Sequence, residues 1–172
     1  MKLLVDAGAD PKIPTAVGVT PLMAAACLDY YEGESPGPLT GVTEAERLEA
    51  VKMCVDLGND VNATTNFGKY ALDGSPEFML KTYPTNIDSL VNMGIGDPRW
   101  NGMTAMHGAV ISNQPSILAY LIGKGGALDV KHQAGWTPYM VSKGIFMANS
   151  KKEFPAAAKL LEAAIAKKNA AK

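Results

Sequence analysis

Two interlocked sequence repeats constrain this chain more than any other feature. Four segments that each begin with glycine align with one another at spacings of 50, 34 and 33 residues, namely GVTPLMAAAC from Gly18, GKYALDGS from Gly68, GMTAMHGAV from Gly102 and GWTPYMVSKG from Gly135. A second series of glycines stands 8 to 10 residues upstream of these, at Gly8, Gly58, Gly94 and Gly125. Self-similarity at a fixed period indicates a stack of small structural units.

Each unit carries the start and stop signals of two helices. A threonine precedes the first apolar segment in three units, and Pro21 and Pro138 then fall at the first helical position, where a missing N–H costs little. The second segment ends in paired apolar residues such as Cys54-Val55, and a glycine follows three residues later, as suits the left-handed residue that closes a helix. We therefore expect helix, turn, helix and a hairpin-like connector. One such unit cannot bury its apolar face alone. The capping threonines are Thr20, Thr104 and Thr137.

These segments resemble the ankyrin repeat along almost the whole chain. GVTPLMAAA and GWTPYM are similar to the family's Gly-x-Thr-Pro-Leu-x-x-Ala pattern, and LGNDVNA resembles its Gly-x-Asp-Val-Asn-Ala connector. The spacing of 33 to 34 residues is the ankyrin period. The overall pattern is also similar to the long ankyrin arrays of bacterial proteins. The resemblance implies an all-α fold, an α-solenoid of stacked helix-turn-helix units joined by hairpin-like loops.

We expect a single domain over residues 1–172. Its divisions are a partial repeat at 1–17, a repeat at 18–67, a degenerate repeat at 68–101, a regular repeat at 102–134 and a C-terminal capping repeat at 135–172. The first of these reads as the end of a second helix, so we expect the chain to be the C-terminal part of a longer array. In the last, a helix from Pro155 should bury Leu160, Leu161 and Ile165 and leave its lysines in water.

The repeat at 18–67 is longer than its neighbours because of an inserted loop at 28–43. Thr43 and Glu46 have the spacing of a capping box, so the second helix should begin there. The loop holds Tyr30, Tyr31 and Glu32, which could contact a partner. Alternatively, the tyrosines pack back on the first helix and the rest of the loop is tolerated surface.

Composition limits the remaining classes of function and location. The chain is 47% hydrophobic and 19% charged, as expected of a globular protein, and its net charge of −1 gives no basic field to hold nucleic acid or a membrane surface. No apolar run approaches the ~20 residues of a membrane span. The first ten residues carry no export signal, which leaves cytoplasm, or periplasm for an exported parent chain, open. Cys27 and Cys54 are expected to be buried thiols.

The two histidines offer the only conceivable chemistry, and we expect no catalytic residue, metal or cofactor. His107 occupies the family's histidine position, which implies a structural side chain that bonds neighbouring loop backbone. An alternative is a metal or acid–base site where His107 converges with Asp73 and Asp97 in stacked units. His132 lies in a connector and is expected to be exposed.

We therefore expect a non-enzymatic scaffold that binds a protein of unknown identity and is monomeric or part of a longer chain. The resemblance implies contact through the connector loops and the concave face, to which we add the inserted loop. An alternative is a purely structural C-terminal cap of a longer array. The expected contact residues are Tyr30, Tyr31, Glu32, Phe67, Arg99, Trp100, His132 and Trp136.

Overall fold

The computed structural model describes residues 2–15, 18–26, 42–66, 101–133, 135–147 and 150–171. The regular secondary structure of these residues is helical apart from one short β-hairpin, in agreement with the predicted all-α class. The helices are α1 (Lys2–Asp6), α2 (Pro21–Ala25), α3 (Glu44–Asp56), α6 (Ala105–Ile111), α7 (Pro115–Gly123), α8 (Pro138–Ser142) and α9 (Pro155–Ala170), and the strands are β1 (Ile145–Met147) and β2 (Ser150–Lys152). Of the helices described, none is long and apolar enough to cross a membrane.

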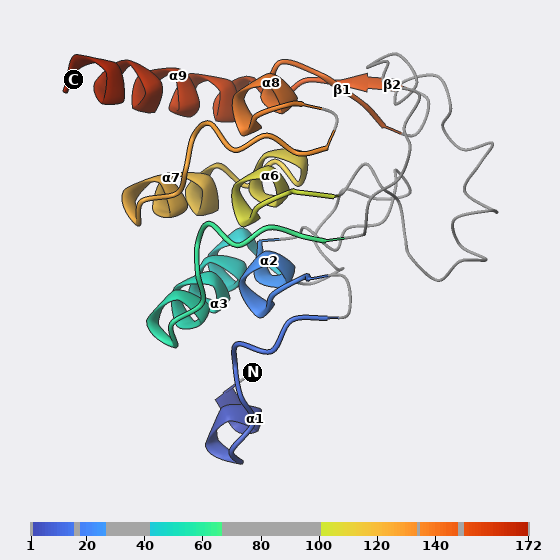
Figure 1. The fold of residues 1–172 in the computed structure, drawn as a ribbon, viewed down its shortest axis with the longest axis vertical. Coiled ribbons are helices and arrows are strands. Elements are labelled where there is room, and N and C mark those ends of the chain that lie inside the picture. The colour runs from blue at the N-terminus through green and yellow to red at the C-terminus, as the bar shows by residue number, and fades with distance from the viewer. Residues whose placement is uncertain are drawn as a thin grey trace.

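The helices pack as pairs that follow one another along the long axis of the molecule (Figure 1). Within pairs, α2 contacts α3, α6 contacts α7, and α8 contacts α9. Between pairs, α2 and α3 pack on α6 and α7, which in turn pack on α8 and α9. Helix α1 stands at one end, and the long α9 covers the other (Figure 1). One continuous apolar core, from Leu22 to Leu161, runs through the pairs.

The three predicted threonines stand at helix N-caps, and the hydroxyls of Thr20 and Thr137 cap their helices, whereas Thr104 makes no side-chain cap bond. The Thr20 hydroxyl accepts a hydrogen bond from the Met23 N–H at 3.2 Å, and the Thr137 hydroxyl accepts one from the Met140 N–H at 3.3 Å. At the start of α3, the Glu46 N–H donates to the Thr43 hydroxyl at 3.2 Å. The Thr43 N–H in turn donates to the Glu46 carboxylate at 2.8 Å, which completes the predicted capping box.

The glycines that close the helices also lie at the predicted positions. Gly8, Gly58 and Gly125 have φ angles of 90°, 86° and 87°, the left-handed region that favours glycine. Each donates its N–H to the carbonyl three residues earlier, at 2.9 to 3.1 Å. The fourth glycine of that series, Gly94, lies outside the described residues. Helices α1, α3 and α7 are therefore closed by the same local geometry.

The last helix pair matches the sequence in its helices and departs from it between them. Helix α9 begins at Pro155 and leaves its lysines exposed, as predicted; of its three predicted core residues Leu161 is buried, whereas Leu160 and Ile165 are half-buried. The chain between α8 and α9 contains the antiparallel β1–β2 hairpin, in which Ile145 pairs with Lys152. Three-residue strands are too short to leave an alternating pattern in the sequence.

The α2–α3 and α6–α7 pairs are direct neighbours. The Asn62 side chain accepts a hydrogen bond from the Ala127 N–H at 2.7 Å and donates one to the Gly125 carbonyl at 3.3 Å. The Glu44 carboxylate accepts from the Ser116 N–H at 2.8 Å, at the uncapped start of α7. These bonds join residues 63 to 72 positions apart in sequence.

The described parts of the repeats at 18–67 and 102–134 contact each other directly. The Thr65 N–H donates to the Met103 carbonyl, and the Gly102 N–H donates to the Thr65 carbonyl, both at 3.0 Å. The degenerate repeat predicted at 68–101 falls almost wholly outside the described residues, so the predicted division of the chain stays a prediction.

Cross-linking will test this adjacency in solution. Cysteines introduced as Glu44→Cys and Ser116→Cys, with Cys27→Ser, should be joined efficiently by a short bis-maleimide because the two positions are hydrogen-bonded neighbours. Cys54 can stay, since burial raises the pKa of its thiol to about 11 and keeps it unreactive. The matched control, Glu44→Cys with Ala156→Cys at the start of α9, lies one helix pair farther away and should remain unlinked. Equal linking of both pairs would contradict the direct packing of α3 and α7.

Candidate binding surface

Three connectors form the same small hairpin. In the first, the Thr15 N–H donates to the Val19 carbonyl and the Gly18 N–H donates to the Thr15 carbonyl, both at 2.9 Å. In the last, the His132 N–H donates to the Trp136 carbonyl at 3.1 Å and the Gly135 N–H donates to the His132 carbonyl at 2.8 Å. The Thr65 and Met103 pairing repeats this pattern across the intervening segment. Gly18, Gly102 and Gly135 therefore occupy equivalent positions.

The hairpins pack against one another in sequence order. A Cβ added to Gly18 would lie 3.0 Å from the Asn66 nitrogen, and one added to Gly102 would lie 3.3 Å from the His132 Cα. A Cβ on Gly135 would meet no described atom within 4 Å. The first two glycines thus allow close backbone approach to the next hairpin, while the third lies at the open end of the row.

His107 joins α6 to the next connector. Its Nδ1 accepts a hydrogen bond from the Thr104 N–H at 3.1 Å and lies 3.0 Å from the Thr104 hydroxyl. Its Nε2 lies 3.3 Å from the Trp136 carbonyl and donates to it, since Nδ1 is the acceptor. The side chain is fully buried, and burial lowers its pKa to about 4. The prediction of a structural histidine that bonds loop backbone is confirmed.

His132 is buried, so the prediction that it is exposed was wrong. Only 4% of its surface is accessible, and its ring lies 5.7 Å from that of His107 and 5.9 Å from that of Trp136. Burial, together with the neighbouring His107 ring, lowers its pKa to about 3. Its backbone closes a hairpin while its ring lies beside α6, and position in a connector alone could not reveal this. His132 therefore does not offer its side chain to a partner.

Of the eight predicted contact residues, the structure describes His132 and Trp136 and brings these two together. Trp136 is half-buried and packs against the core, so the residue keeps some accessible surface. The other six lie outside the described residues: Tyr30, Tyr31, Glu32, Phe67, Arg99 and Trp100. Asp73 and Asp97, proposed as companions of His107, and Cys27 lie outside them too.

Met140 is an exposed apolar residue that the sequence reading missed. It is 45% exposed on α8, four residues after Trp136. The signal was available in the helical period, because Pro138 and Val141 are buried on one face of α8 and position 140 falls on another. On the same helix, Lys143 and the Tyr139 hydroxyl both bind the Glu162 carboxylate of α9, at 3.1 and 2.8 Å.

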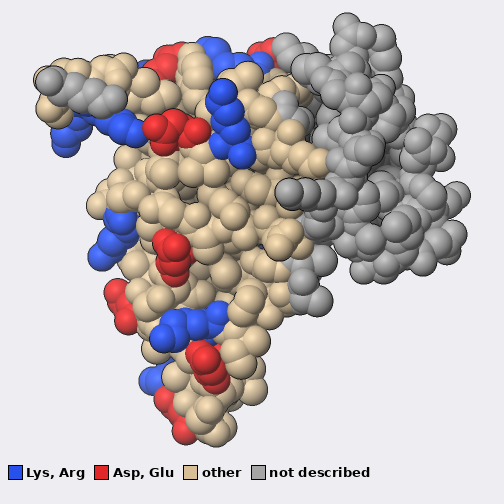
Figure 2. Space-filling model, viewed as in Figure 1, with Lys and Arg blue, Asp and Glu red and all other residues tan. Residues whose placement is uncertain are grey.

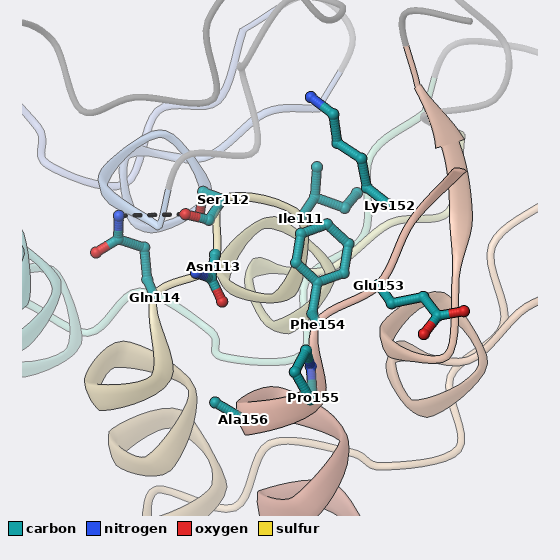
Figure 3. A pocket seen from close by; sticks show the side chains of 9 residues that line it. All are labelled: Ile111, Ser112, Asn113, Gln114, Lys152, Glu153, Phe154, Pro155 and Ala156. Atoms are coloured by element: carbon teal, nitrogen blue, oxygen red, sulfur yellow. Dashed lines mark hydrogen bonds between the residues drawn. The ribbon is translucent and has the colours of Figure 1, made fainter. Parts of the chain in front are cut away.

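An open groove of about 630 Å³ lies between the α6–α7 turn and the segment that leads from β2 into α9 (Figure 3). Its floor includes Ile111 and Asn113, and its wall includes Phe154 and Ala156. The Gln114 amide that borders it donates to the Ser112 carbonyl at 3.3 Å. The groove lies where the short turn between α6 and α7 stands beside the longer connection between α8 and α9, which carries the hairpin. Sequence motifs of single residues do not reveal such a difference in connection length.

Charges of both signs are interspersed on the face seen in Figure 2, without a patch of one sign among the residues described there. Exposed pairs join Lys52 to Glu49 at 2.7 Å and Lys168 to Asp129 at 3.1 Å. Within the described part of the chain, no group of three or more His, Cys, Asp or Glu side chains is placed to hold a metal ion.

Comparison with known proteins adds no identification. No protein-family model matches the chain, and no curated protein matches it either.

The two buried histidines predict a pH dependence of stability. In the unfolded chain histidine titrates near 6.5, whereas the folded pKa values are about 4 and about 3, so the unfolded state binds more protons as the pH falls below 6.5. The free energy of unfolding should be constant above that pH and decline below it, by up to about 1.4 kcal/mol per pH unit for each histidine. Urea unfolding at pH 7.5 to 4.5 measures this.

A His132→Gln variant provides the control for that series. Because it removes one of the two titrating groups, its decline below pH 6.5 should be about half as steep. Glu46 and Glu162 also have lowered pKa values, from hydrogen bonds to Thr43 and to Tyr139 respectively, but as carboxylates they act below about pH 4.5. A flat profile between pH 6.5 and 5 would contradict the buried, neutral histidines.

Proposed function

We propose that this chain is an ankyrin-type solenoid that binds another protein and catalyses no reaction. The observation that carries the proposal is the row of equivalent hairpins, in which Gly18 backs onto residues 64–66 and Gly102 onto residues 131–133. This spatial repetition agrees with the sequence repeat from which the resemblance to ankyrin proteins was inferred. Such a stack projects its connector loops from a rigid body of helices.

A rigid array of loops is suited to binding. Because the hairpins are held by backbone hydrogen bonds and by the next hairpin in the row, little conformational entropy is lost when a partner docks. Trp136 and Met140 supply partly exposed aromatic and thioether surface at one end of that row. Such side chains are enriched in protein interfaces. We keep Tyr30, Tyr31, Glu32, Phe67, Arg99 and Trp100 in the proposed contact set and remove His132.

The alternative of a metal or acid–base site at His107 is disfavoured by its hydrogen bonds. Nδ1 is engaged by Thr104, and Nε2 carries the proton bonded to the Trp136 carbonyl. A metal ligand or general base needs an available nitrogen lone pair, and the one on Nδ1 becomes available only if its bond from Thr104 breaks. The structural-cap alternative is favoured by one observation, the exposed polar face of α9, where Lys159, Glu162 and Lys167 lie in water.

Two glycine substitutions test the stacking of hairpins on which the proposal rests. Gly18→Ala and Gly135→Ala carry similar left-handed strain, at φ 75° and 84°. Only the first places a Cβ against backbone of the next hairpin, 3.0 Å from Asn66. Gly18→Ala should therefore destabilise the protein by about 1 kcal/mol more than Gly135→Ala. Urea unfolding of both variants measures the difference, and equal losses would argue against close packing at Gly18.

Site-specific photocross-linking tests the binding function. A benzophenone amino acid placed at Met140, which is 45% exposed, should give a discrete adduct with a protein in lysate of the source organism. The control position is Glu49 on α3, whose side chain is 70% exposed on a different helix of the stack. We expect no corresponding adduct there. The same adduct at both positions, or none at position 140, would remove this surface from the proposal and leave the structural cap.

A further inference from the structure

Asn101 and Gly102 form the only Asn-Gly pair in the sequence, and both lie in the hairpin that Thr65 and Met103 close. An asparagine followed by glycine is the pair most prone to spontaneous deamidation, because a residue without Cβ lets its backbone nitrogen approach the preceding side chain closely. Asn101 is half-buried, so water reaches part of the residue. The proposed binding function makes no use of its side chain.

Deamidation of this pair is a ring closure followed by hydrolysis. Hydroxide removes the proton from the Gly102 nitrogen, which attacks the side-chain Cγ of Asn101. A bond forms between these two atoms while the bond from Cγ to Nδ2 breaks. The departing Nδ2 takes a proton from water and leaves as ammonia, which regenerates the hydroxide. Water then opens the five-membered imide at one of its two carbonyls and gives aspartate or isoaspartate, so the net exchange is water for ammonia.

In the structure each reacting group is held by a neighbouring part of the hairpin row. The Gly102 N–H donates to the Thr65 carbonyl at 3.0 Å, so the proton that must leave is engaged. The Nδ2 of Asn101, which is the leaving group, donates to the Gln133 side-chain oxygen at 3.0 Å. The Asn101 carbonyl accepts from the Gln133 N–H at 2.8 Å. Gly102 also backs onto His132, whose Cα would lie 3.3 Å from an added Cβ.

We propose that Asn101 is a latent deamidation site, which the stacked hairpins protect and which reacts when they separate. The protection comes from two sides, because Thr65 precedes the pair in the same hairpin and Gln133 belongs to the next connector. Loss of the Thr65 contact exposes the nucleophilic nitrogen to hydroxide. Loss of the Gln133 contact releases the leaving group and the carbonyl between them. The rate of deamidation therefore reports how often this part of the row opens.

Deamidation also makes such an opening irreversible. An ionised aspartate at position 101 has no side-chain N–H, so it cannot donate to the Gln133 oxygen as the asparagine does. Isoaspartate in addition carries the main chain through Cβ, which adds one carbon to the hairpin between Thr65 and Met103. Both products weaken the contact between the two connectors, and isoaspartate weakens it more. A stack that has opened for long enough thus closes less firmly.

Deamidation rates of the folded and the unfolded protein test the protection. The full chain is kept in mildly alkaline buffer with and without urea, and peptides that carry residue 101 are quantified by mass spectrometry, with isoaspartate separated by chromatography. We expect Asn101 to deamidate at least about tenfold more slowly in the folded protein, because reaction there requires the hairpins to open first. Equal rates in the two states would overturn the proposal.

Two variants at position 133 test the role of the side-chain hydrogen bond. Gln133→Ala removes the acceptor and should raise the rate in the folded protein by roughly three- to tenfold, the equivalent of one net hydrogen bond. Gln133→Glu keeps an acceptor oxygen at the same reach and should retain most of the protection. In urea all three proteins should react at the same rate.

An unchanged rate in folded Gln133→Ala, or the same acceleration in both variants, would contradict the proposal. If Gln133→Ala does not fold, the comparison of the folded and unfolded parent chain still decides, because it needs no variant. None of these outcomes depends on a binding partner, so failure here leaves the proposed function standing.

Discussion

Each second helix in this protein depends on two neighbours to cover its apolar residues. Cys54 on α3 and Leu121 on α7 are fully buried only because a first helix lies on one side and the next pair on another. Among the described helices none packs extensively on α1, and its Leu4 is 65% exposed. The apolar surface buried between consecutive pairs supplies most of the stabilisation that a single helical hairpin of this size could not obtain alone.

Polar contacts fix the spacing and register that apolar packing leaves loose. Asn62 binds the following connector at both its oxygen and its nitrogen, and Glu44 caps the following α7. His107 does the same one pair further on, since it joins Thr104 at the start of α6 to the Trp136 carbonyl. Hydrogen bonds are directional, so each of these side chains admits one relative placement of two units. Because burial disfavours the charged imidazolium, His107 makes this contact in its neutral form.

Local features of this fold could be predicted from sequence, and those that depend on neighbours could not. A threonine cap, a capping box at Thr43 and Glu46, or a closing glycine involves residues within about one helical turn, so the sequence contains both partners. Adjacency is different. The 34-residue spacing between Gly68 and Gly102 predicts a repeated phase, yet Thr65 pairs directly with Met103. A regular spacing of repeats along the sequence does not determine which repeats contact each other in space.

The same distinction explains the candidate surface. The sequence indicated Trp136 because large aromatic side chains in connectors often contact partners, and the residue is half-buried in the structure. It could not place His132, whose ring lies beside that of His107 on α6. Met140, by contrast, could have been found from the helical period of α8, since it falls on a different face from Pro138 and Val141. The groove beside Phe154 required the lengths of two neighbouring helix connections, because it forms only where they differ.

The structural use of both histidines bears on what kind of protein this is. A side chain that holds two units in register must keep its hydrogen bonds, whereas a general base or metal ligand must be able to change partners. In His107 both ring nitrogens are engaged in joining units, and desolvation disfavours the charged form that acid–base work would pass through. His132 is similarly held beside it. Both histidines therefore stabilise the scaffold, and the recognition that we propose rests on exposed residues of the connectors and of α8.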